Sequence, residues 1–445
     1  MTYVKNMKLI MKVKRNMQQK NKSVRLLMSS SILKKSLNLS LKWIEEHGWE
    51  SYDLYDVLGL PFLLKIQRLR RKSRVLNLSL SPLVALALIF SNEIRKVFNI
   101  KKSRDAVVSA LLAKSFLNLY QLTGEVVYLK RCEALLEWLL ENSVKWDKGI
   151  GWGYNFNWEA ATVMIPARTP ISVVTSIVTR LLISAYELTQ REYYLNVLRE
   201  VMEFFLNDLN KFKLKSGVCF SYTPIDDMMV HNANLMIAEA LVKLGALFKV
   251  KEAVELAFEA VRFTISDQNL DGSFYYFFKE YAKEKSLNNV IDNFHTGYVI
   301  YSLCEIYRYR KEKWLESSLV RAKDFYFNKL FKGVIPVPRY PPPRFLKNRI
   351  LCHDCSQGIL TTLKLASLSL TNPKLAIGMA LWAIHYFQDP EGYFYYSLNV
   401  NGVGLVKKNY MRWGLAWMLL ALTELFKYFK VEVLCSNEGM FIVSK

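Results

Sequence analysis

Proton-handling side chains gather at the start of a predicted helix in this chain of 445 residues. In the stretch DNFHTGYVIYSLCEIY, an apolar run with helical spacing follows Asp292, Asn293, His295 and Thr296. A single Asp or Thr would suffice to accept hydrogen bonds from the free amide groups of a first helical turn. The excess over this need indicates a binding or catalytic role.

Acids and histidines of this kind suit chemistry on sugars. Asp226 in SYTPIDD and Asp292 in the next unit lie in loops with little other reason for an acid. In such a pair, one carboxyl group donates a proton while the other activates water or attacks the sugar. We therefore predict Asp226, Asp292 and His295 as catalytic residues. His231 and His353 stand at positions that match His295 and would orient substrate or exchange protons.

Aromatic and polar side chains occur near the same predicted helix starts. Aromatic rings offer flat apolar faces to the CH side of a sugar, while Asn, His, Gln and Arg hold its hydroxyl groups. The predicted substrate-binding residues are Tyr55, Trp152, Tyr154, Trp158, Tyr222, His231, Asn232, Asn234, Tyr298, His353, Gln357, Tyr395, Arg412 and Trp413.

Motifs for other chemistries are few. The sequence contains no G-x-S-x-G nucleophile motif, no Walker phosphate loop and no dinucleotide fingerprint. One metal alternative rests on the motif CHDC, because Cys352 and His353 together with Cys219 would give zinc three ligands and an open position. The leading interpretation requires no metal and no cofactor.

The elements that position these residues recur along the chain. Short turns between two helical patterns occur in LTGEVVYL, LTQREYYL, FKVKEAVE, RYRKEKWL and LTNPKLAI. Longer loops with a glycine and aromatics lie between them, and each precedes a helix with a polar start. The intervals from Thr169 to His231, His295, His353 and Arg412 are 62, 64, 58 and 59 residues. The repeating unit is therefore helix, tight turn, helix and long loop.

This repeat predicts an all-α fold, an (α/α)6 toroid of about six helical hairpins. The alternative is an open solenoid with a concave face. A closed ring is favoured because the helices after the long loops are apolar over much of their circumference. Short β-ribbons are expected in the loops at FYYFF and YFYYS. If the inner helices run parallel, their polar N-termini meet at one cavity, where their amide groups favour anions.

Charge is concentrated near the N-terminus. Residues 1–104 hold 22 Lys and Arg and six acids, within a total net charge of +22. We expect this basic quarter to make peripheral contact with an anionic membrane, and we expect no specific nucleic-acid binding because no such motif occurs. The predicted divisions are a basic arm over 1–30, the toroid over 31–430 and a tail over 431–445. The apolar segment VLNLSLSPLVALALIF is predicted to begin a buried helix.

Cysteine usage and the first residues bear on location. Six cysteines are few for this length and suit a reducing compartment. The basic N-terminal stretch lacks the uninterrupted apolar core and small-residue cleavage site of a secretory signal. We therefore expect a cytoplasmic protein, with membrane contact limited to its periphery.

Seven ordered motifs carry a family resemblance. They are YDLYDVLGLP, GWGYNFNW with TPISVVTS, CFSYTPIDDMMVHNANL, DGSFYY with IDNFHTGYV, CHDCSQGI, GYFYY and NYMRWGLAWM. From Tyr52 to Met418 the chain resembles the VpsJ-like polysaccharide biosynthesis proteins, a family of six-hairpin, glycosidase-like toroids. The resemblance implies a role in making or processing cell-surface polysaccharide. The family tends to carry acids where this chain has Asn157 and Leu351, which weakens the expectation of hydrolysis.

Three functions therefore stay open. The first is a carbohydrate-active enzyme, a glycosidase or a sugar epimerase, acting on an oligosaccharide, a polysaccharide or an activated sugar. An epimerase needs two proton-transferring groups on opposite faces of one sugar carbon, and the histidines meet this need better than the acids. The second is a non-catalytic glycan-binding or scaffold subunit of a polysaccharide assembly. The third is a zinc-dependent toroid that resembles the lanthionine cyclases.

Overall fold

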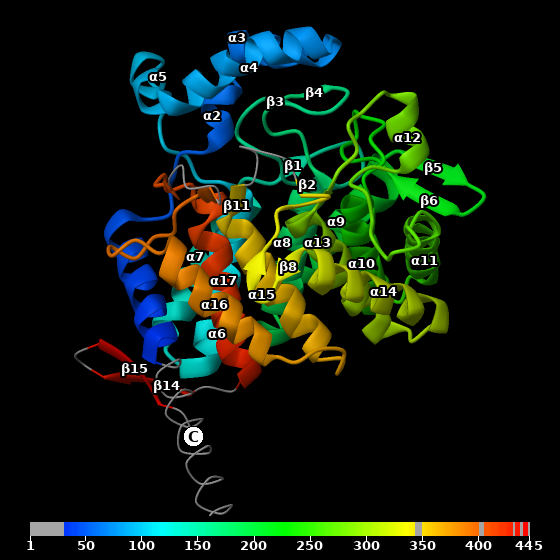
Figure 1. Cartoon of the computed structure of the whole chain (residues 1–445). Coiled ribbons are helices and arrows are strands. Elements are labelled where there is room, and N and C mark those ends of the chain that lie inside the picture. Colours follow the sequence, from blue (N-terminus) through cyan, green and yellow to red (C-terminus); the bar gives the residue numbers. More distant parts are fainter. Residues whose placement is uncertain (1–30, 343–348, 400–404, 430–431, 437–438, 444–445) are drawn as a thin grey trace, which may run out of the picture.

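Twelve helices form two concentric rings in the computed structural model, which describes residues 31–342, 349–399, 405–429, 432–436 and 439–443 (Figure 1). The predicted arm over 1–30 lies outside these residues. The inner helices are α6 (Ala106–Thr123), α8 (Ser172–Thr189), α10 (His231–Phe248), α13 (Asn293–Tyr309), α15 (Cys352–Ala366) and α17 (Leu415–Phe429). The outer helices are α7 (Val126–Glu141), α9 (Glu192–Glu203), α11 (Lys251–Ser266), α14 (Lys313–Lys329), α16 (Lys374–Phe387) and a first helix over 31–47.

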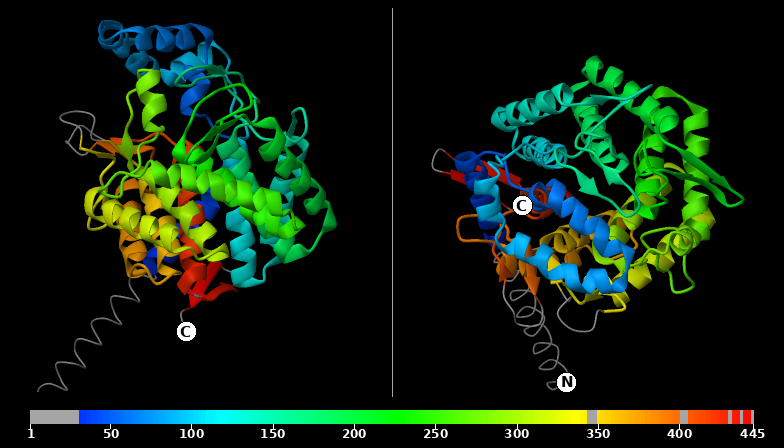
Figure 2. Two further views of the ribbon diagram at one scale, coloured as in Figure 1. Left: turned by 90° about the vertical axis from the view of Figure 1, so that its right-hand side faces the viewer. Right: turned by 90° about the horizontal axis from the view of Figure 1, so that it is seen from above.

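The inner ring is closed. Each inner helix contacts the next one along the chain, and α17 contacts α6 to complete the circle. The view from above in Figure 2 shows the ring directly. The (α/α)6 toroid is therefore confirmed, and the open solenoid is wrong.

Tight turns join the first five inner helices, α6 to α15, to their outer partners, as the repeat predicted. Gly124, Gln190 and Lys249 cap α6, α8 and α10 in the left-handed conformation, with φ values of 74°, 54° and 59°. A residue in this conformation ends a helix by turning its amide groups back onto the last carbonyls. The first and second helices of each hairpin therefore run antiparallel.

The glycines of the long loops hold successive hairpins together. A Cβ atom on Gly217 would lie 2.1 Å from the carbonyl oxygen of Glu259 on α11, and one on Gly392 would lie 2.2 Å from that of Leu39. No side chain fits at such distances. The contact with Leu39 also identifies the helix over 31–47 as the sixth outer helix.

Most of the short antiparallel strands line the loops at one end of the toroid, and the last pair lies at the opposite end, beyond the end of α17 (Figure 1). They are β1 (Val144–Lys145) with β2 (Ile150–Gly151), β3 (Trp158–Glu159) with β4 (Met164–Ile165), β5 (Lys211–Leu214) with β6 (Gly217–Phe220), β7 (Ile291–Asp292) with β10 (Arg339–Tyr340), β8 (Phe331–Lys332) with β9 (Ile335–Pro336), β12 (Ser397–Asn399) between β11 (Arg349–Leu351) and β13 (Leu405–Val406), and β14 (Glu432–Ser436) with β15 (Gly439–Val443). The long loops carry short ribbons, as expected. Within the two named stretches, FYYFF forms an isolated bridge between Phe277 and Val230, and YFYYS forms one between Phe394 and Gln388 and ends on the first residue of β12.

Four helices between the first outer helix and α6 project beyond the loops (Figures 1 and 2). They are α2 (Leu54–Leu58), α3 (Pro61–Lys72), α4 (Arg74–Ile89) and α5 (Ser91–Val97). We call this group the hairpin, because its two long helices, α3 and α4, pack against each other. Their small core of Val57, Leu63 and Ala87 is separate from the toroid core. The prediction of a buried helix at α4 is wrong, because most of its side chains face outward.

Helix length and composition also bear on membranes. Within the described part of the chain, no single helix is both long and apolar enough to cross a bilayer. The residues Val75–Ile89 and Ser91–Val97 together reach that length and composition, but they are bent by 74°. The remaining short elements are α12 (Lys279–Glu284), a π-helical turn (Phe204–Asp208) and a 3-10 turn (Met411–Trp413).

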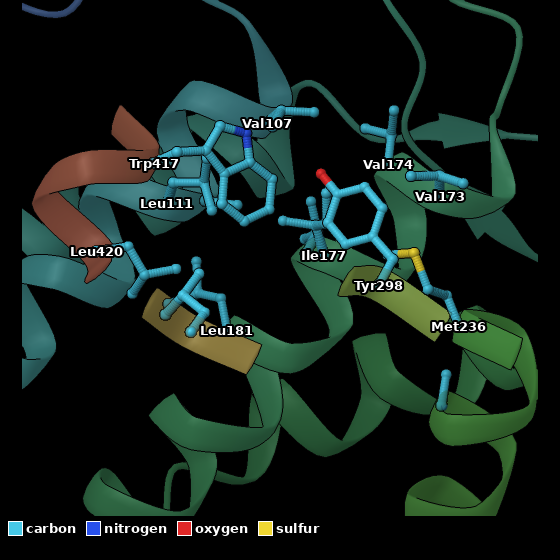
Figure 3. Close-up of a cluster of buried hydrophobic side chains, with 14 of the residues drawn as sticks. Val107, Leu111, Val173, Val174, Ile177, Leu181, Met236, Tyr298, Trp417 and Leu420 are labelled. Carbon is cyan, nitrogen blue, oxygen red and sulfur yellow. The ribbon is translucent and has the colours of Figure 1, made fainter. Parts of the chain in front are cut away.

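Apolar side chains fill the ring just inside the mouth formed by the inner-helix N-termini. Figure 3 shows Val107, Ile177, Tyr298 and Trp417, from four inner helices, pointing toward one another. Leu111, Leu181 and Leu420 extend this layer along the same helices. The layer separates the mouth from the other end of the ring.

Ion pairs join the inner helices deeper in the ring. Arg180 of α8 forms a two-pronged pair with the buried Glu239 of α10, its Nε lying 3.0 Å from Oε1. Lys243 bridges Glu239 and Glu305 at 2.7 and 2.8 Å, and Lys364 of α15 reaches Glu305 at 2.9 Å. Buried charges require such partners, so these contacts fix the helices relative to one another.

Replacing Arg180 tests this network. We expect Arg180→Leu to lower the free energy of unfolding by about 3–5 kcal/mol, because it leaves the Glu239 carboxylate buried without its main partner. The matched control is Lys145→Leu, since Lys145 pairs with Glu200 at the surface and its loss should cost less than about 1 kcal/mol. Urea unfolding measures both, and equal effects would show that the buried pair does not hold the ring.

Candidate functional site

The second residue of five of the six inner helices faces a cavity of about 210 Å³ at the ring mouth. Val107, Val173, Asn232, Phe294 and His353 all occupy this position, in α6, α8, α10, α13 and α15. Since the helices run parallel and begin at the same depth, side chains at this position all point toward the axis of the ring. The helix starts therefore converge on one site, as the repeat predicted.

His295 and Asp292 form one polar pair at this cavity. Asp292 is the N-cap of α13, and its Oδ1 accepts a hydrogen bond from the backbone N–H of His295 at 3.0 Å. Its Oδ2 lies 2.7 Å from Nδ1 of the same histidine. The cap thus orients the imidazole, which is partly exposed and lines the cavity. With Nδ1 held, Nε2 is left for a ligand.

His353 and Tyr298 form a second pair on neighbouring helices. The Tyr298 hydroxyl lies 2.8 Å from Nε2 of His353. The imidazole is stacked between Phe294 and Trp417, each with its ring centroid 4.7 Å away. Burial, together with the charges of His295 and Arg412, lowers the pKa of His353 well below its usual value. Burial likewise raises the pKa of Tyr298 well above its usual value, so both groups are neutral near pH 7.

Arg412 places a fixed positive charge at the cavity wall. Its Nε and Nη2 donate to the two oxygens of Asp53 at 2.8 and 2.7 Å. The guanidinium also lies 4.6 Å from the centroid of Tyr154 and 4.7 Å from that of Trp413. Burial opposes the charge on Arg412, but Asp53 outweighs it and raises the pKa. The side chain is therefore rigidly positioned and charged.

Three buried polar atoms at the cavity have no hydrogen-bond partner among the described residues. They are Oδ1 of Asn232, Nδ1 of His353 and Nε1 of Trp413. Leaving a buried polar atom unpaired costs about 1–3 kcal/mol. Their presence in residues that line one cavity indicates a polar ligand.

Ten of the predicted site residues line this cavity. They are Tyr55, Tyr154, Trp158, Tyr222, Asn232, His295, Tyr298, His353, Arg412 and Trp413. Asn232, His295, Tyr298 and His353 lie on α10, α13 and α15. The others lie on α2, in the loops before α8 and α10, and in the 3-10 turn before α17.

Five predicted binding residues lie outside the cavity lining and form hydrogen bonds within the fold. His231 is the first residue of α10, and its Nε2 lies 2.9 Å from Asp267 beside the outer helix. The side chain of Asn234 forms hydrogen bonds with Phe220, Ala260 and Thr264, and that of Gln357 donates one to Thr361. The indole of Trp152 donates a hydrogen bond to the carbonyl oxygen of Leu139, and the Tyr395 hydroxyl donates one to Asp389. None of these five lines the cavity.

The two predicted catalytic acids do not face each other across one cavity. Asp226 accepts hydrogen bonds from Tyr222 N, Thr223 N and Met228 N at 3.1, 2.7 and 2.9 Å, so it organises its own loop. It lines an outer groove, whereas Asp292 lies behind His295. The predicted division of labour between these acids therefore has no geometric support.

The outer groove has a volume of about 1330 Å³ and adjoins the cavity through Tyr55 and Trp158, which line both. Glu159 and Asp227 line it on the toroid side, and Arg71 and Asn77 on the hairpin side. Its size exceeds the roughly 300–1,000 Å³ of common small-ligand sites, whereas the cavity is smaller than that range. A long ligand could therefore extend from the cavity into the groove.

Sequence reasoning missed several lining residues. Phe156, Phe294, Tyr276 and Trp417 form much of the aromatic wall, and Asp53 holds Arg412. Phe294 lies at the helix position shared by Asn232 and His353, so alignment of the helix starts could have identified it. The Asp53 partnership carries no local signal, because the two residues are 359 positions apart.

The zinc alternative is not supported by side-chain grouping. The structure describes no cluster of three or more His, Cys, Asp or Glu side chains that could hold a metal ion. Cys219, Cys352 and Cys355 are buried and free, and burial raises the pKa of each thiol. These cysteines act as small apolar residues in the core.

Solved structures share this fold. No family model and no curated protein sequence matches the chain. Cellobiose 2-epimerase from Bacillus thermoamylovorans has a TM-score of 0.57 at 10% identity, covering 74% of this chain and 90% of that chain. D-mannose isomerase has a TM-score of 0.56 at 12% identity, with 73% and 87% covered. An unsaturated glucuronyl hydrolase specific for heparin has 0.54 at 14%, with 73% and 87% covered. These likenesses show a six-hairpin, glycosidase-like toroid; the narrower VpsJ-like resemblance stays a prediction.

The acid Asp105 gives the site region a testable pH dependence. Burial raises its pKa from 3.8 to about 6, although Arg412 and the N–H groups of Val107 and Val108 oppose the rise. The folded protein therefore holds this proton more tightly than the unfolded chain, and the associated stability is lost as the pH rises from about 4 to about 6.

We expect Asp105→Asn to remove this loss while keeping a good helix cap. Between pH 4 and pH 7 the variant should gain about 2–3 kcal/mol in unfolding free energy relative to the wild type, measured by urea denaturation at each pH. Asp227→Asn is the control of opposite sign: burial opposes ionisation there, but the hydrogen bonds from Lys285 and Tyr281 and the charge of Lys285 together outweigh it and lower the pKa. An identical pH profile for Asp105→Asn and wild type would contradict the assignment.

Proposed function

We propose that this protein is a carbohydrate-active enzyme that isomerises or epimerises a sugar by proton transfer. The observation that carries the proposal is the pairing of His295 with Asp292 and of His353 with Tyr298 at one aromatic-walled cavity. An isomerase or epimerase requires two proton-handling groups within reach of one sugar. Here His295 and Tyr298 lie one turn apart on α13, with ring centroids 6.2 Å apart, and His353 of the adjacent helix α15 contacts Tyr298.

His295 is suited to act as the general base. Asp292 fixes its ring orientation and stabilises the imidazolium that forms when Nε2 accepts a proton from the sugar. The cap position of Asp292 holds its carboxylate in place, because Oδ1 also accepts the His295 N–H. The base therefore needs no rearrangement before it acts.

Tyr298 and His353 are suited to supply the second proton-handling group. The raised pKa of Tyr298 keeps its hydroxyl protonated near pH 7, so that it can donate to a sugar oxygen or a carbanion. The neutral His353 beside it orients this hydroxyl, and the phenolate left after donation regains a proton from solvent as the His295 imidazolium releases one. Proton removal by His295 and delivery by Tyr298 would invert or relocate a stereocentre.

The positions of the carboxylates favour proton transfer over hydrolysis. Hydrolysis by paired carboxylates requires both groups to flank the bond that breaks. The described residues that line the cavity include two histidines and no Asp or Glu. Glu159, Asp226 and Asp227 line the outer groove instead.

The ligand-gripping atoms favour a sugar over an apolar ligand. Asn232 Oδ1, Trp413 Nε1 and the charged Arg412 can bond hydroxyl groups or a carboxylate, while Tyr154 and Trp158 offer flat faces. The cavity would take a single sugar ring, and the groove would take the remainder of an oligosaccharide, a polysaccharide or an activated sugar. We further propose that the substrate belongs to cell-surface polysaccharide metabolism in the cytoplasm, on the strength of the ordered motifs.

Solvent-deuterium exchange tests the reaction. We expect the protein, incubated in deuterated water with a panel of hexoses, disaccharides and uronic acids, to introduce carbon-bound deuterium into one of them without bond cleavage. His295→Gln should slow this exchange by roughly 10²–10⁴-fold, because the base is lost. His385→Gln, an exposed histidine on α16, is the matched control and should leave the rate unchanged.

Other outcomes separate the alternatives. Cleavage of a glycosidic bond without label uptake would replace the proposal with a hydrolase. Tight binding of a sugar with neither cleavage nor label would support a non-catalytic glycan-binding subunit.

Asp292→Asn tests the orienting role separately. We expect this variant to lower kcat by about 10²–10⁴-fold with little change in KM, because an amide can hold the ring in the wrong tautomer and cannot stabilise the imidazolium. Asparagine is an equally good N-cap, so the unfolding midpoint should stay close to that of the wild type. A rise in KM alone would show that Asp292 contributes to substrate binding and does not assist the base.

A further inference from the structure

One face of α4 is apolar and uncovered. Val75, Leu78, Pro82, Leu86 and Ile89 follow one another at intervals of three or four residues, so they share a face of the helix. Val75, Leu78 and Ile89 are 75%, 71% and 64% exposed. Soluble proteins rarely leave so continuous an apolar stripe without a partner. We call this stripe the α4 face.

Further exposed apolar side chains extend the α4 face toward α5 and α3. Phe90 follows directly after α4, Val97 ends α5, and Phe98 follows it, each more than half exposed. Phe98 stacks on the ring of Phe62 at the start of α3, with centroids 5.8 Å apart. The apolar surface therefore spans the bend between the two helices.

Basic side chains surround this apolar surface. Residues 61–102 contain ten Lys and Arg and a single acid, Glu93. Arg68 and Arg71 pair with Glu159, and Arg95 pairs with Asp56. Five exposed lysines have no ion-pair partner within the described residues: Lys65, Lys72, Lys96, Lys101 and Lys102.

The opposite side of the hairpin is already occupied. Val84 and Ala87 of α4 are buried, and Ala87 lies in the small core with Val57 and Leu63. Lys408 of the toroid donates from Nζ to the carbonyl oxygen of Leu88 at 2.7 Å. The hairpin is thus fixed to the toroid on one side, and the α4 face is what it presents outward.

We propose that the α4 face docks on an anionic lipid bilayer. Apolar side chains would enter the boundary between headgroups and acyl chains, while the free lysines would meet acidic headgroups. The 74° bend between α4 and α5 and the buried opposite side of α4 suit a helix that lies on the membrane and does not cross it. The lysine excess favours lipid over a second copy of this basic chain, because two such surfaces repel each other.

Docking would also hold the outer groove beside the membrane. Gln67, Arg71, Ser73 and Asn77 belong to the same hairpin and line the groove. The membrane contact predicted for the whole basic quarter is thereby assigned to a defined surface. This inference does not depend on the proposed reaction.

Vesicle sedimentation tests the proposal. We expect the full chain to bind vesicles of phosphatidylcholine with phosphatidylglycerol, and to bind pure phosphatidylcholine vesicles much more weakly. The double variant Leu78→Asp/Leu86→Asp should weaken binding by about tenfold or more, because two leucines no longer leave water. Both sites are exposed, and an unchanged thermal unfolding midpoint shows that the fold is intact.

A matched double variant controls for charge. Val126→Asp/Val127→Asp adds the same two charges to an exposed turn of α7, away from the hairpin, and should leave binding unchanged. Equal binding by wild type and Leu78→Asp/Leu86→Asp would overturn the proposal. A second result would also overturn it: the wild type does not bind vesicles and sediments as a dimer, whereas Leu78→Asp/Leu86→Asp sediments as a monomer. The α4 face would then be a contact between copies of the chain.

Discussion

The ion pairs among the inner helices are the constraint on which the rest of the structure depends. Glu239 is almost fully buried and receives both Arg180 of α8 and Lys243 of its own helix, and Lys243 continues to Glu305 of α13. Rotating or sliding one helix would leave a charge unpaired in a medium of low dielectric constant. The helices are therefore held at one relative depth, and this makes their second residues converge on the cavity.

That rigidity allows the ring mouth to carry groups that do not favour folding. Asn232, His353 and Trp413 each leave a buried polar atom without a partner, at a cost of about 1–3 kcal/mol per atom. Domains are usually stable by only about 5–15 kcal/mol, so such groups persist only where other contacts offset them. The apolar layer below the cavity supplies that compensation (Figure 3).

The sequence was informative wherever a property repeated. Tight turns and polar helix starts recurred at regular intervals, and they predicted the closed ring and its single mouth. Register within a helix start was not predictable in the same way. His231 is the first residue of its helix and His353 the second, and one position on a helix turns a side chain by about 100°. His231 therefore reaches the outer layer, while its neighbour Asn232 faces the cavity.

The structure differs from the sequence prediction at two further places, α4 and Asp226, because local sequence patterns do not contain the information that decides them. Hydropathy alone predicts that α4 is a core helix. An apolar sequence is the same whether or not the protein's own core covers its side chains, so hydropathy cannot distinguish the two cases. Asp226 appeared free of turn duties, yet three backbone N–H groups of its own loop converge on its carboxylate. The hydrogen bonds of an irregular loop depend on its folded path, which its composition does not specify.

The acids and the imidazoles lie in different parts of the binding surface, the acids in the outer groove and the imidazoles in the cavity. The cavity is small, aromatic and lined by His295 and His353, whereas Glu159, Asp226 and Asp227 are confined to the larger groove outside it. A group must touch the reacting atoms to transfer a proton, so acids in the groove can act only on parts of a ligand that extend beyond the cavity. In the proposed reaction, proton transfer therefore falls to the side chains that line the cavity, and the acids would recognise or orient the parts of a ligand that extend beyond the cavity.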